Sequence, residues 1–212
     1  MKDPKLKHDL VLFDFDGTLA DSLPWLSGAT ARLAQAFNFR VPPPDEIERL
    51  RDGGPNNILS AMGIPLWKMP RIAAAMRKMM AEDVATIRLF DGIEGFIRRL
   101  HARGVRLGIV SSNGEANVRT VLGPATAKLF QRYECGVSLL GKAAKLRRAA
   151  KLAKAEHALY VGDEIRDFEA AEKARMPFGA VGWGFSTVAA FEKRRPRVIF
   201  RSILEMEDYL TG

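Results

Sequence analysis

A short apolar run that ends in two closely spaced carboxylates constrains this chain more than any other feature. Leu10–Phe13 has the composition of a strand buried on both faces of a sheet, and it is followed at once by Asp14, Asp16 and the turn residue Gly17. Side chains alternate along a strand, so Asp14 and Asp16 point the same way and Phe15 points oppositely. Two adjacent carboxylates repel each other and are costly to desolvate, and a bound cation such as Mg²⁺ would relieve both effects. The same residues also fit a plain acidic turn.

The segment Asp14 to Leu19, which reads Asp-Phe-Asp-Gly-Thr-Leu, resembles the first motif of the haloacid dehalogenase (HAD) superfamily of phosphatases. The resemblance implies that Asp14 is a nucleophile and that Asp16 is a general acid and base. It also implies three further parts in a fixed order: a Ser or Thr after a second strand, a lysine, and a late acidic pair.

Two of these parts stand where the resemblance requires them. Ser111 follows an expected strand at 105–110, and Gly162-Asp163-Glu164-Ile165-Arg166-Asp167 matches the fourth motif, Gly-Asp-x-x-x-Asp, after an expected strand at 158–161. Each feature alone could be a helix cap or a turn. Because the carboxyl ends of neighbouring parallel strands converge on one crevice, their joint occurrence favours a common site.

The lysine is less well defined by the sequence. Family members commonly have a Lys-Pro pair here, whereas Gly141-Lys142-Ala143-Ala144-Lys145 has no proline. Lys142 lies at the start of an expected helix, nearer the strand ends, and is preferred. Lys145, one helical turn later, is the alternative.

The resemblance implies a Mg²⁺ site and a phosphate site built from these motifs. Asp14, Asp163 and the backbone carbonyl of Asp16 would bind the metal ion, with Asp167 behind them. The phosphoryl oxygens would be held by side chains and backbone N–H groups of Phe15, Asp16, Ser111, Ser112, Asn113 and Lys142.

Strands that alternate with helices after residue 89 predict an α/β fold with a doubly wound parallel sheet, the Rossmann-like HAD core. We expect strands also at 133–137, 178–182 and 198–200, and two helices at 115–122 and 125–130. Residues 21–88 contain no convincing strand, so the expected division is a core of 1–20 and 89–212 with an all-helical cap of 21–88. Within the cap, Arg51 is a candidate to bind an anionic substrate tail.

A helical cap inserted after the first motif resembles the subgroup that contains phosphoglycolate phosphatases and β-phosphoglucomutases. The segment Val181 to Phe185 also resembles a Trp-Gly-Tyr/Phe stretch in phosphoglycolate phosphatase-like members. A tight turn around a packed Trp183 would explain the same residues equally well.

Composition sets outer limits on the function. The 212 residues carry a net charge of +8, but the basic runs are not interleaved with aromatic residues, which favours a solvated basic face over nucleic-acid binding. The single cysteine, Cys135, fits a reducing compartment, and no apolar run approaches the length of a membrane span. We therefore expect a cytoplasmic protein, a monomer or a homodimer, that acts on a small molecule and binds neither nucleic acid nor membrane.

The expected function is a Mg²⁺-dependent phosphomonoester hydrolase for a small phosphorylated metabolite, with 2-phosphoglycolate as the candidate substrate, acting through an aspartyl-phosphate. Two alternatives remain open at this point: a phosphosugar mutase of the β-phosphoglucomutase kind, and a non-catalytic protein that binds anions or nucleic acid through its positive charge.

Overall fold

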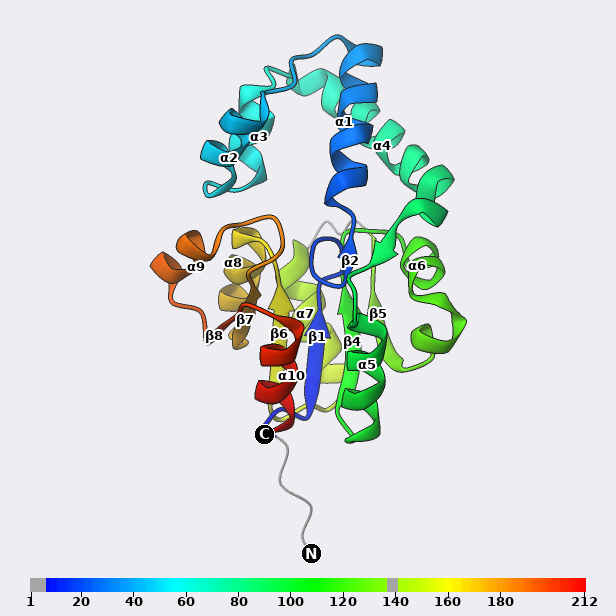
Figure 1. Ribbon diagram of the computed structural model, residues 1–212, viewed down its shortest axis with the longest axis vertical. Coiled ribbons are helices and arrows are strands. Elements are labelled where there is room, and N and C mark those ends of the chain that lie inside the picture. Colours follow the sequence, from blue (N-terminus) through cyan, green and yellow to red (C-terminus); the bar gives the residue numbers. More distant parts are fainter. Residues whose placement is uncertain (1–6, 137–140) are drawn as a thin grey trace, which may run out of the picture.

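A single parallel sheet forms the centre of the molecule. The computed structural model describes residues 7–136 and 141–212 (Figure 1). The six strands lie in the order β5-β4-β1-β6-β7-β8 and all neighbours are parallel. Their bounds are β1 Leu10–Phe13, β4 Arg106–Val110, β5 Phe130–Glu134, β6 Ala158–Gly162, β7 Phe178–Val181 and β8 Val198–Phe200. From β1 the chain winds first to one side and then to the other, so the predicted doubly wound α/β core is confirmed.

Helices cover both faces of this sheet. One face packs on α5 (Ile93–Ala102), α6 (Glu115–Ala127) and α10 (Ile203–Thr211), and the other on α7 (Gly141–Leu152), α8 (Ile165–Ala174) and α9 (Val188–Arg194). Within β1, Val11 and Phe13 belong to the first cluster and Leu10 and Leu12 to the second, and all four are fully buried. The alternation of a strand thus explains why this short run is apolar at every position.

Four helices lie beyond the carboxyl ends of the strands (Figure 1). They are α1 (Leu23–Phe37), α2 (Pro44–Arg51), α3 (Pro55–Ala61) and α4 (Met69–Asp83), with single 3₁₀ turns η1 (Leu66–Lys68) and η2 (Val84–Thr86) on either side of α4. Trp25 of α1 donates from Nε1 to Oδ2 of Asp83 at the end of α4, at 3.0 Å, and Arg32 forms an ion pair with the same carboxylate. These contacts hold the two long helices together.

The chain passes between this helical group and the core through two short segments that pair with each other. β2 (Ala20–Asp21) and β3 (Arg88–Leu89) form an antiparallel ladder that the sequence did not predict. Such two-residue strands carry too few side chains to show a periodicity. Their pairing places the start and the end of the helical group side by side.

Two further predictions need correction. β5 ends at Glu134 and begins at Phe130, so the predicted strand at 133–137 lies too far along, and its last residue falls outside the described residues. The reason is that Phe130 is a buried strand residue, not the end of the preceding helix. The helices predicted at 115–122 and 125–130 correspond to the two parts of α6, which ends at Ala127 and not at residue 130, and which is broken where Gly123 adopts a φ of +71° before Pro124.

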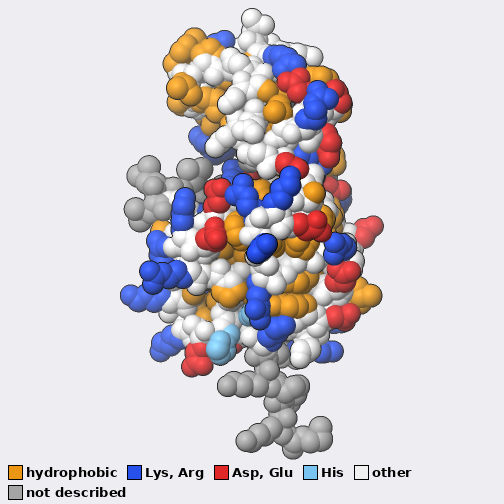
Figure 2. Space-filling model, turned by 90° about the vertical axis from the view of Figure 1, so that its left-hand side faces the viewer, with side chains coloured by type: hydrophobic (Ala, Val, Ile, Leu, Met, Phe, Trp, Pro, Cys, Tyr) orange, Lys and Arg blue, Asp and Glu red, His pale blue; other side chains and the backbone are white. Residues whose placement is uncertain are grey.

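No helix within residues 7–136 and 141–212 is both long and apolar enough to cross a bilayer. Figure 2 shows one face of the molecule, on which many Lys and Arg side chains lie over the sheet-and-helix core, interspersed with Asp and Glu.

Candidate active site

Three buried carboxylates meet at the carboxyl edge of the sheet. Asp14 follows β1, Asp163 follows β6, and Asp167 lies in the first turn of α8, and each is at most 4% exposed. One oxygen from each lies within 4.8 Å of the other two. The arrangement arises because β1 and β6 are paired in register, so both strands end at the same level. Clustered carboxylate oxygens are the donors that Mg²⁺ prefers, and the residues present therefore fit a divalent ion.

Lys142 connects two of these carboxylates. Its Nζ donates to Asp14 Oδ2 at 2.9 Å and to Asp167 Oδ1 at 2.5 Å. Lys145 lies one turn further along α7, and its Nζ donates instead to the backbone carbonyls of Ser111, at 3.1 Å, and Gly136. Of the two candidate lysines, the structure therefore places Lys142 against Asp14.

Burial dominates the protonation of these groups. It raises the pKa of Asp14 to about 8, against the opposing effect of the Lys142 charge. Burial also raises the pKa of Asp163, and the nearby Asp167 adds to that effect. For Lys142, burial alone would lower the pKa, but Asp14 and Asp167 outweigh it and raise the pKa above its ordinary value. An additional cation beside Asp14 would stabilise its ionised form, which is the form a nucleophile needs.

Asp163 is held by groups from two separate loops. Its Oδ1 accepts a hydrogen bond from Thr18 Oγ1 at 3.0 Å, and its Oδ2 accepts one from the backbone N–H of Phe185 at 2.9 Å. Gly17 has a φ of +73°, and a Cβ there would lie 2.1 Å from Asp163 Oδ2. A Cβ on Gly184 would lie 2.2 Å from Asp163 Cβ. Both glycines are thus required by the close approach of the two loops to this carboxylate.

Asp16 and the segment after β4 face each other across the edge. Asn113 Nδ2 lies 3.2 Å from Asp16 Oδ2, and the backbone N–H of Asn113 donates to the buried Ser111 Oγ at 3.1 Å. Burial raises the pKa of Asp16, while hydrogen bonding from Ser22 and Asn113 opposes the shift. A carboxyl group that keeps a proton more easily than usual suits general acid catalysis.

A cavity of about 410 Å³ opens between this edge and the helical group. The core contributes Asp16, Ser112, Asn113, Asp163, Arg166 and Phe185, and helices α1 and α4 contribute Leu23, Trp25, Leu26, Met76, Arg77 and Met80. Its floor is therefore polar and acidic, and its roof is largely apolar. This volume suits a small ligand.

Arg51 is not brought into this cavity with the other candidates. Its guanidinium donates to the carbonyl oxygens of Phe185, at 2.5 Å, and Gly184, at 3.0 Å. The next residue, Asp52, accepts a hydrogen bond from Thr187 Oγ1. The end of α2 therefore binds the same loop that holds Asp163. Phe15 also contributes no side chain to the site, because its ring is fully buried in the core.

Several residues of the site carry no clear signal in the sequence. Thr18 belongs to the first motif, but only the fold shows that its hydroxyl reaches Asp163, 145 positions away. The apolar cavity residues of α1 and α4 have ordinary helical spacing, which core packing explains equally well. Only their position over Asp16 distinguishes these cavity residues from ordinary core residues.

Comparison with known proteins agrees with this geometry. Residues 11–181 match the haloacid dehalogenase-like hydrolase family. The chain is 32% identical to a phosphoglycolate phosphatase of Synechococcus elongatus, over 83% of this chain and 84% of that protein. It is 27% identical to the tyrosine-protein kinase PtkA of Mycobacterium tuberculosis, over 92% of this chain and 69% of that protein. Among solved structures, a haloacid dehalogenase-like family protein from Streptococcus pneumoniae superposes with a TM-score of 0.80 at 20% identity, covering 96% and 98% of the two chains.

A parallel core with an acidic edge, four motifs in order and this degree of similarity define the class: the chain belongs to the haloacid dehalogenase-like hydrolase family. The resemblance found in the sequence is thereby confirmed. Several of the similar proteins are phosphoglycolate phosphatases.

Proposed function

We propose that this chain is a Mg²⁺-dependent phosphomonoester hydrolase that acts on a small phosphorylated metabolite. Family membership and the phosphatases among its relatives support the enzyme class, a HAD-type phosphatase. The observation that carries the proposal is the position of Asp14, which lies against Lys142 and close to two further buried carboxylates, one of which, Asp163, lines the cavity.

The reaction would proceed in two displacements at phosphorus. An oxygen of Asp14 forms a bond to phosphorus while the ester P–O bond breaks, and Asp16 donates a proton to the departing alkoxide. Asp16 then takes a proton from a water molecule that attacks the aspartyl-phosphate, which releases phosphate and regenerates Asp14. The raised pKa of Asp16 is consistent with its donating a proton in the first step.

The surrounding groups would balance the negative charge of both reactants. Asp14, Asp163 and the backbone carbonyl of Asp16 would hold Mg²⁺, with Asp167 behind them, and the ion would supply positive charge between carboxylate and phosphate. Ser111, Ser112, Asn113 and Lys142, with the backbone N–H of Phe15, would hold the phosphoryl oxygens as charge moves onto them. The hydrogen bond from Lys142 to Asp167 supports this role, because it fixes the position of the ammonium group.

The substrate proposal follows from the cavity and the relatives. A volume of about 410 Å³ with an apolar roof accommodates a small organic phosphate. 2-Phosphoglycolate is the first candidate because several relatives are phosphoglycolate phosphatases. We further propose that residues 21–88 act as a cap that closes over the bound substrate.

We also propose a cytoplasmic protein. Cys135 is partly buried, and burial raises the pKa of its thiol to about 12, so it is an unreactive residue compatible with a reducing compartment.

A phosphate-release screen over small phosphorylated metabolites with Mg²⁺ tests the proposal. We expect release from 2-phosphoglycolate or a close analogue, and loss of release by at least about 10³-fold in Asp14→Asn, with an unchanged far-UV spectrum. Full activity in Asp14→Asn would refute the assignment of Asp14 as the nucleophile. Isomerised sugar phosphate in place of free phosphate would identify a mutase instead.

A further inference from the structure

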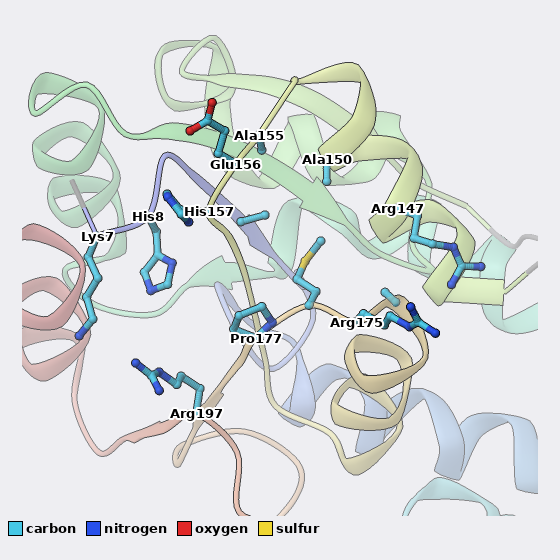
Figure 3. A pocket seen from close by; sticks show the side chains of 13 residues that line it. Lys7, His8, Arg147, Ala150, Ala155, Glu156, His157, Arg175, Pro177 and Arg197 are labelled. Carbon is cyan, nitrogen blue, oxygen red and sulfur yellow. The ribbon is translucent and has the colours of Figure 1, made fainter. Parts of the chain in front are cut away.

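A second cavity, of about 540 Å³, lies at the opposite edge of the sheet from the carboxylates (Figure 3). His8 and His157 line it from the positions just before β1 and β6, whose far ends carry Asp14 and Asp163. Asp14 lies six residue steps along an extended chain from His8, which corresponds to roughly 20 Å. This cavity is therefore a separate place in the molecule and shares no lining residue with the candidate active site.

His8 is the unusual residue of the cavity. Its side chain is only 7% exposed, and within the described residues at least one of Nδ1 and Nε2 has no hydrogen-bond partner, the backbone of His157 being near enough to bond to the other. The ring stacks on Tyr209, with centroids 5.9 Å apart and planes at 26°. Stacking fixes the plane of the imidazole without engaging either nitrogen. A buried polar group without a partner is costly, so a ligand that bonds to this ring would be favoured.

Four cations line the same cavity, and none forms an ion pair within residues 7–136 and 141–212: Lys7, Arg147, Arg175 and Arg197. Arg147 donates to the carbonyl of Lys173 at 2.8 Å, and Arg175 ends α8, where a cation stabilises the helix terminus. The Lys7 ammonium lies 3.7 Å from the centre of the Tyr209 ring, and in Figure 3 both Lys7 and Arg197 lie at the same end as His8.

Within the part of the chain that the structure describes, the nearest acids do not neutralise this end. Asp9 follows His8 directly, but its carboxylate accepts hydrogen bonds from the backbone N–H groups of Glu156 and His157 and from Arg106. Glu156 lines the cavity, and in Figure 3 its carboxylate points away from His8. Burial lowers the pKa of His8, a hydrogen bond to the backbone of His157 opposes the shift, and the charges of Lys7 and Arg197 add to the lowering.

We propose that this cavity is a binding site for a small organic phosphate with an apolar body. The phosphate group would lie against His8, Lys7 and Arg197. The body would rest on the small and apolar side chains of the cavity, among them Met176 and Pro177, and extend toward Arg147 and Arg175. A doubly charged oxyanion satisfies the imidazole donor and both cations at once, which a neutral ligand cannot do.

Histidine-ring NMR reads this site directly, because the chain has three histidines and the described part of the active site contains none. The metal-free protein is titrated with phenylphosphonate, which the enzyme cannot hydrolyse, at constant ionic strength. We expect saturable chemical-shift changes of His8 and His157, with the signals of His101 of α5 unchanged.

Arg197→Gln should weaken binding about tenfold, the loss expected for one charge-assisted contact. Lys193→Gln, an equal change of charge at an exposed residue outside the cavity, should leave the affinity unchanged.

Several results would overturn the proposal. These are shifts that do not saturate, shifts of all three histidines in parallel, or equal affinity in wild type and Arg197→Gln. Equal or tighter binding of benzoate would overturn the assignment to a phosphate, and equally tight binding of inorganic phosphate would overturn the role of the apolar surface. Because the readout is the histidine rings and not turnover, failure here leaves the proposed hydrolase untouched.

Discussion

Lys142 Nζ lies 2.9 Å from Asp14 Oδ2, across 128 positions of the chain, and the same ammonium group also bonds to Asp167. One side chain thus neutralises part of a carboxylate cluster that would otherwise resist ionisation. The neighbouring Lys145 is turned to backbone carbonyls and does not reach Asp14. This difference between two lysines on one helix leads to the first prediction.

Lys142→Ala should lower kcat for phosphate release by about 10²-fold or more, because the charge that stabilises the phosphoryl oxygens and the ionised Asp14 is lost. Lys145→Ala serves as the matched control and should retain most of the activity, since it removes only contacts to two carbonyls. Steady-state kinetics on both variants compare them. A larger loss in Lys145→Ala would reverse the assignment.

Thr18→Val should weaken the response to Mg²⁺, because it removes the hydroxyl that donates to Asp163 while keeping the size of the side chain. Loss of such a supporting hydrogen bond typically costs about 10- to 100-fold in metal affinity. The measurement is the Mg²⁺ concentration for half-maximal activity. Thr120→Val, on the exposed surface of α6, is the control, and an equal response in the two variants would contradict the prediction.

Gly17→Ala should abolish activity and lower stability. The φ of +73° disfavours any Cβ, and the added methyl would meet Asp163 Oδ2 at 2.1 Å. Gly28→Ala in α1 is the opposite case, since a Cβ there meets nothing within 4 Å. Replacing an exposed helical glycine by alanine should raise the free energy of unfolding by about 0.5–1 kcal/mol. Thermal unfolding and phosphate release together check the pair. An active Gly17→Ala protein would show that the loop can move aside.

Arg51→Ala should loosen the contact between α2 and the 184–187 loop, because the carbonyls of Gly184 and Phe185 lose their donor. We expect faster amide hydrogen exchange in that loop, and a KM that increases by a similar factor for all substrates. Arg49→Ala removes only an exposed pair with Asp45 and is the control. A KM effect restricted to substrates with a second anionic group would instead support the substrate-binding role expected for Arg51 from the sequence.

Asp9 should make stability depend on pH. Burial raises its pKa, but hydrogen bonds from the backbone N–H groups of Glu156 and His157 and the pair with Arg106 outweigh this, so its pKa is lowered overall. A lowered pKa stabilises the fold above the ordinary pKa of about 4, and the stabilisation is lost as the pH falls through the lowered value. Asp9→Ala should therefore cost about 1–3 kcal/mol near neutral pH and progressively less below about pH 4. Denaturant unfolding at several pH values measures the difference, with Asp208→Ala, on the exposed face of α10, as control. A difference that stays constant with pH would contradict the mechanism.

The sequence was sufficient to predict the core because local pattern and topology agree there. The run Leu10–Phe13 is apolar at every position, and burial on both faces of the sheet is the reason. The motif residues Asp14, Ser111 and Asp163 each end a strand, so a parallel sheet brings them to one edge without further information. Lys142 follows from the same reasoning, because it begins the helix nearest that edge.

What the sequence could not predict depends on packing between distant segments. Arg51 carries a positive charge in a polar segment, which fits a substrate contact as well as a structural one, and only the fold shows that it faces two carbonyls. Thr18 is similar, since a hydroxyl in a turn has many possible partners. The pairing of β2 with β3 involves two residues on each side, too few for any periodicity.

The strands β1 and β6 have candidate functional residues at both ends, and this limits how far the length of these strands can change. Removing one residue within β1 would reverse the facing of every side chain beyond the deletion, and would displace Asp14 relative to His8 by one step of the strand. Loops that do not contact the carboxylates can change length without moving them, but the four or five residues between the edges cannot. Change over evolutionary time should therefore accumulate in the helical group and in the turns, while the span from one edge to the other keeps its length.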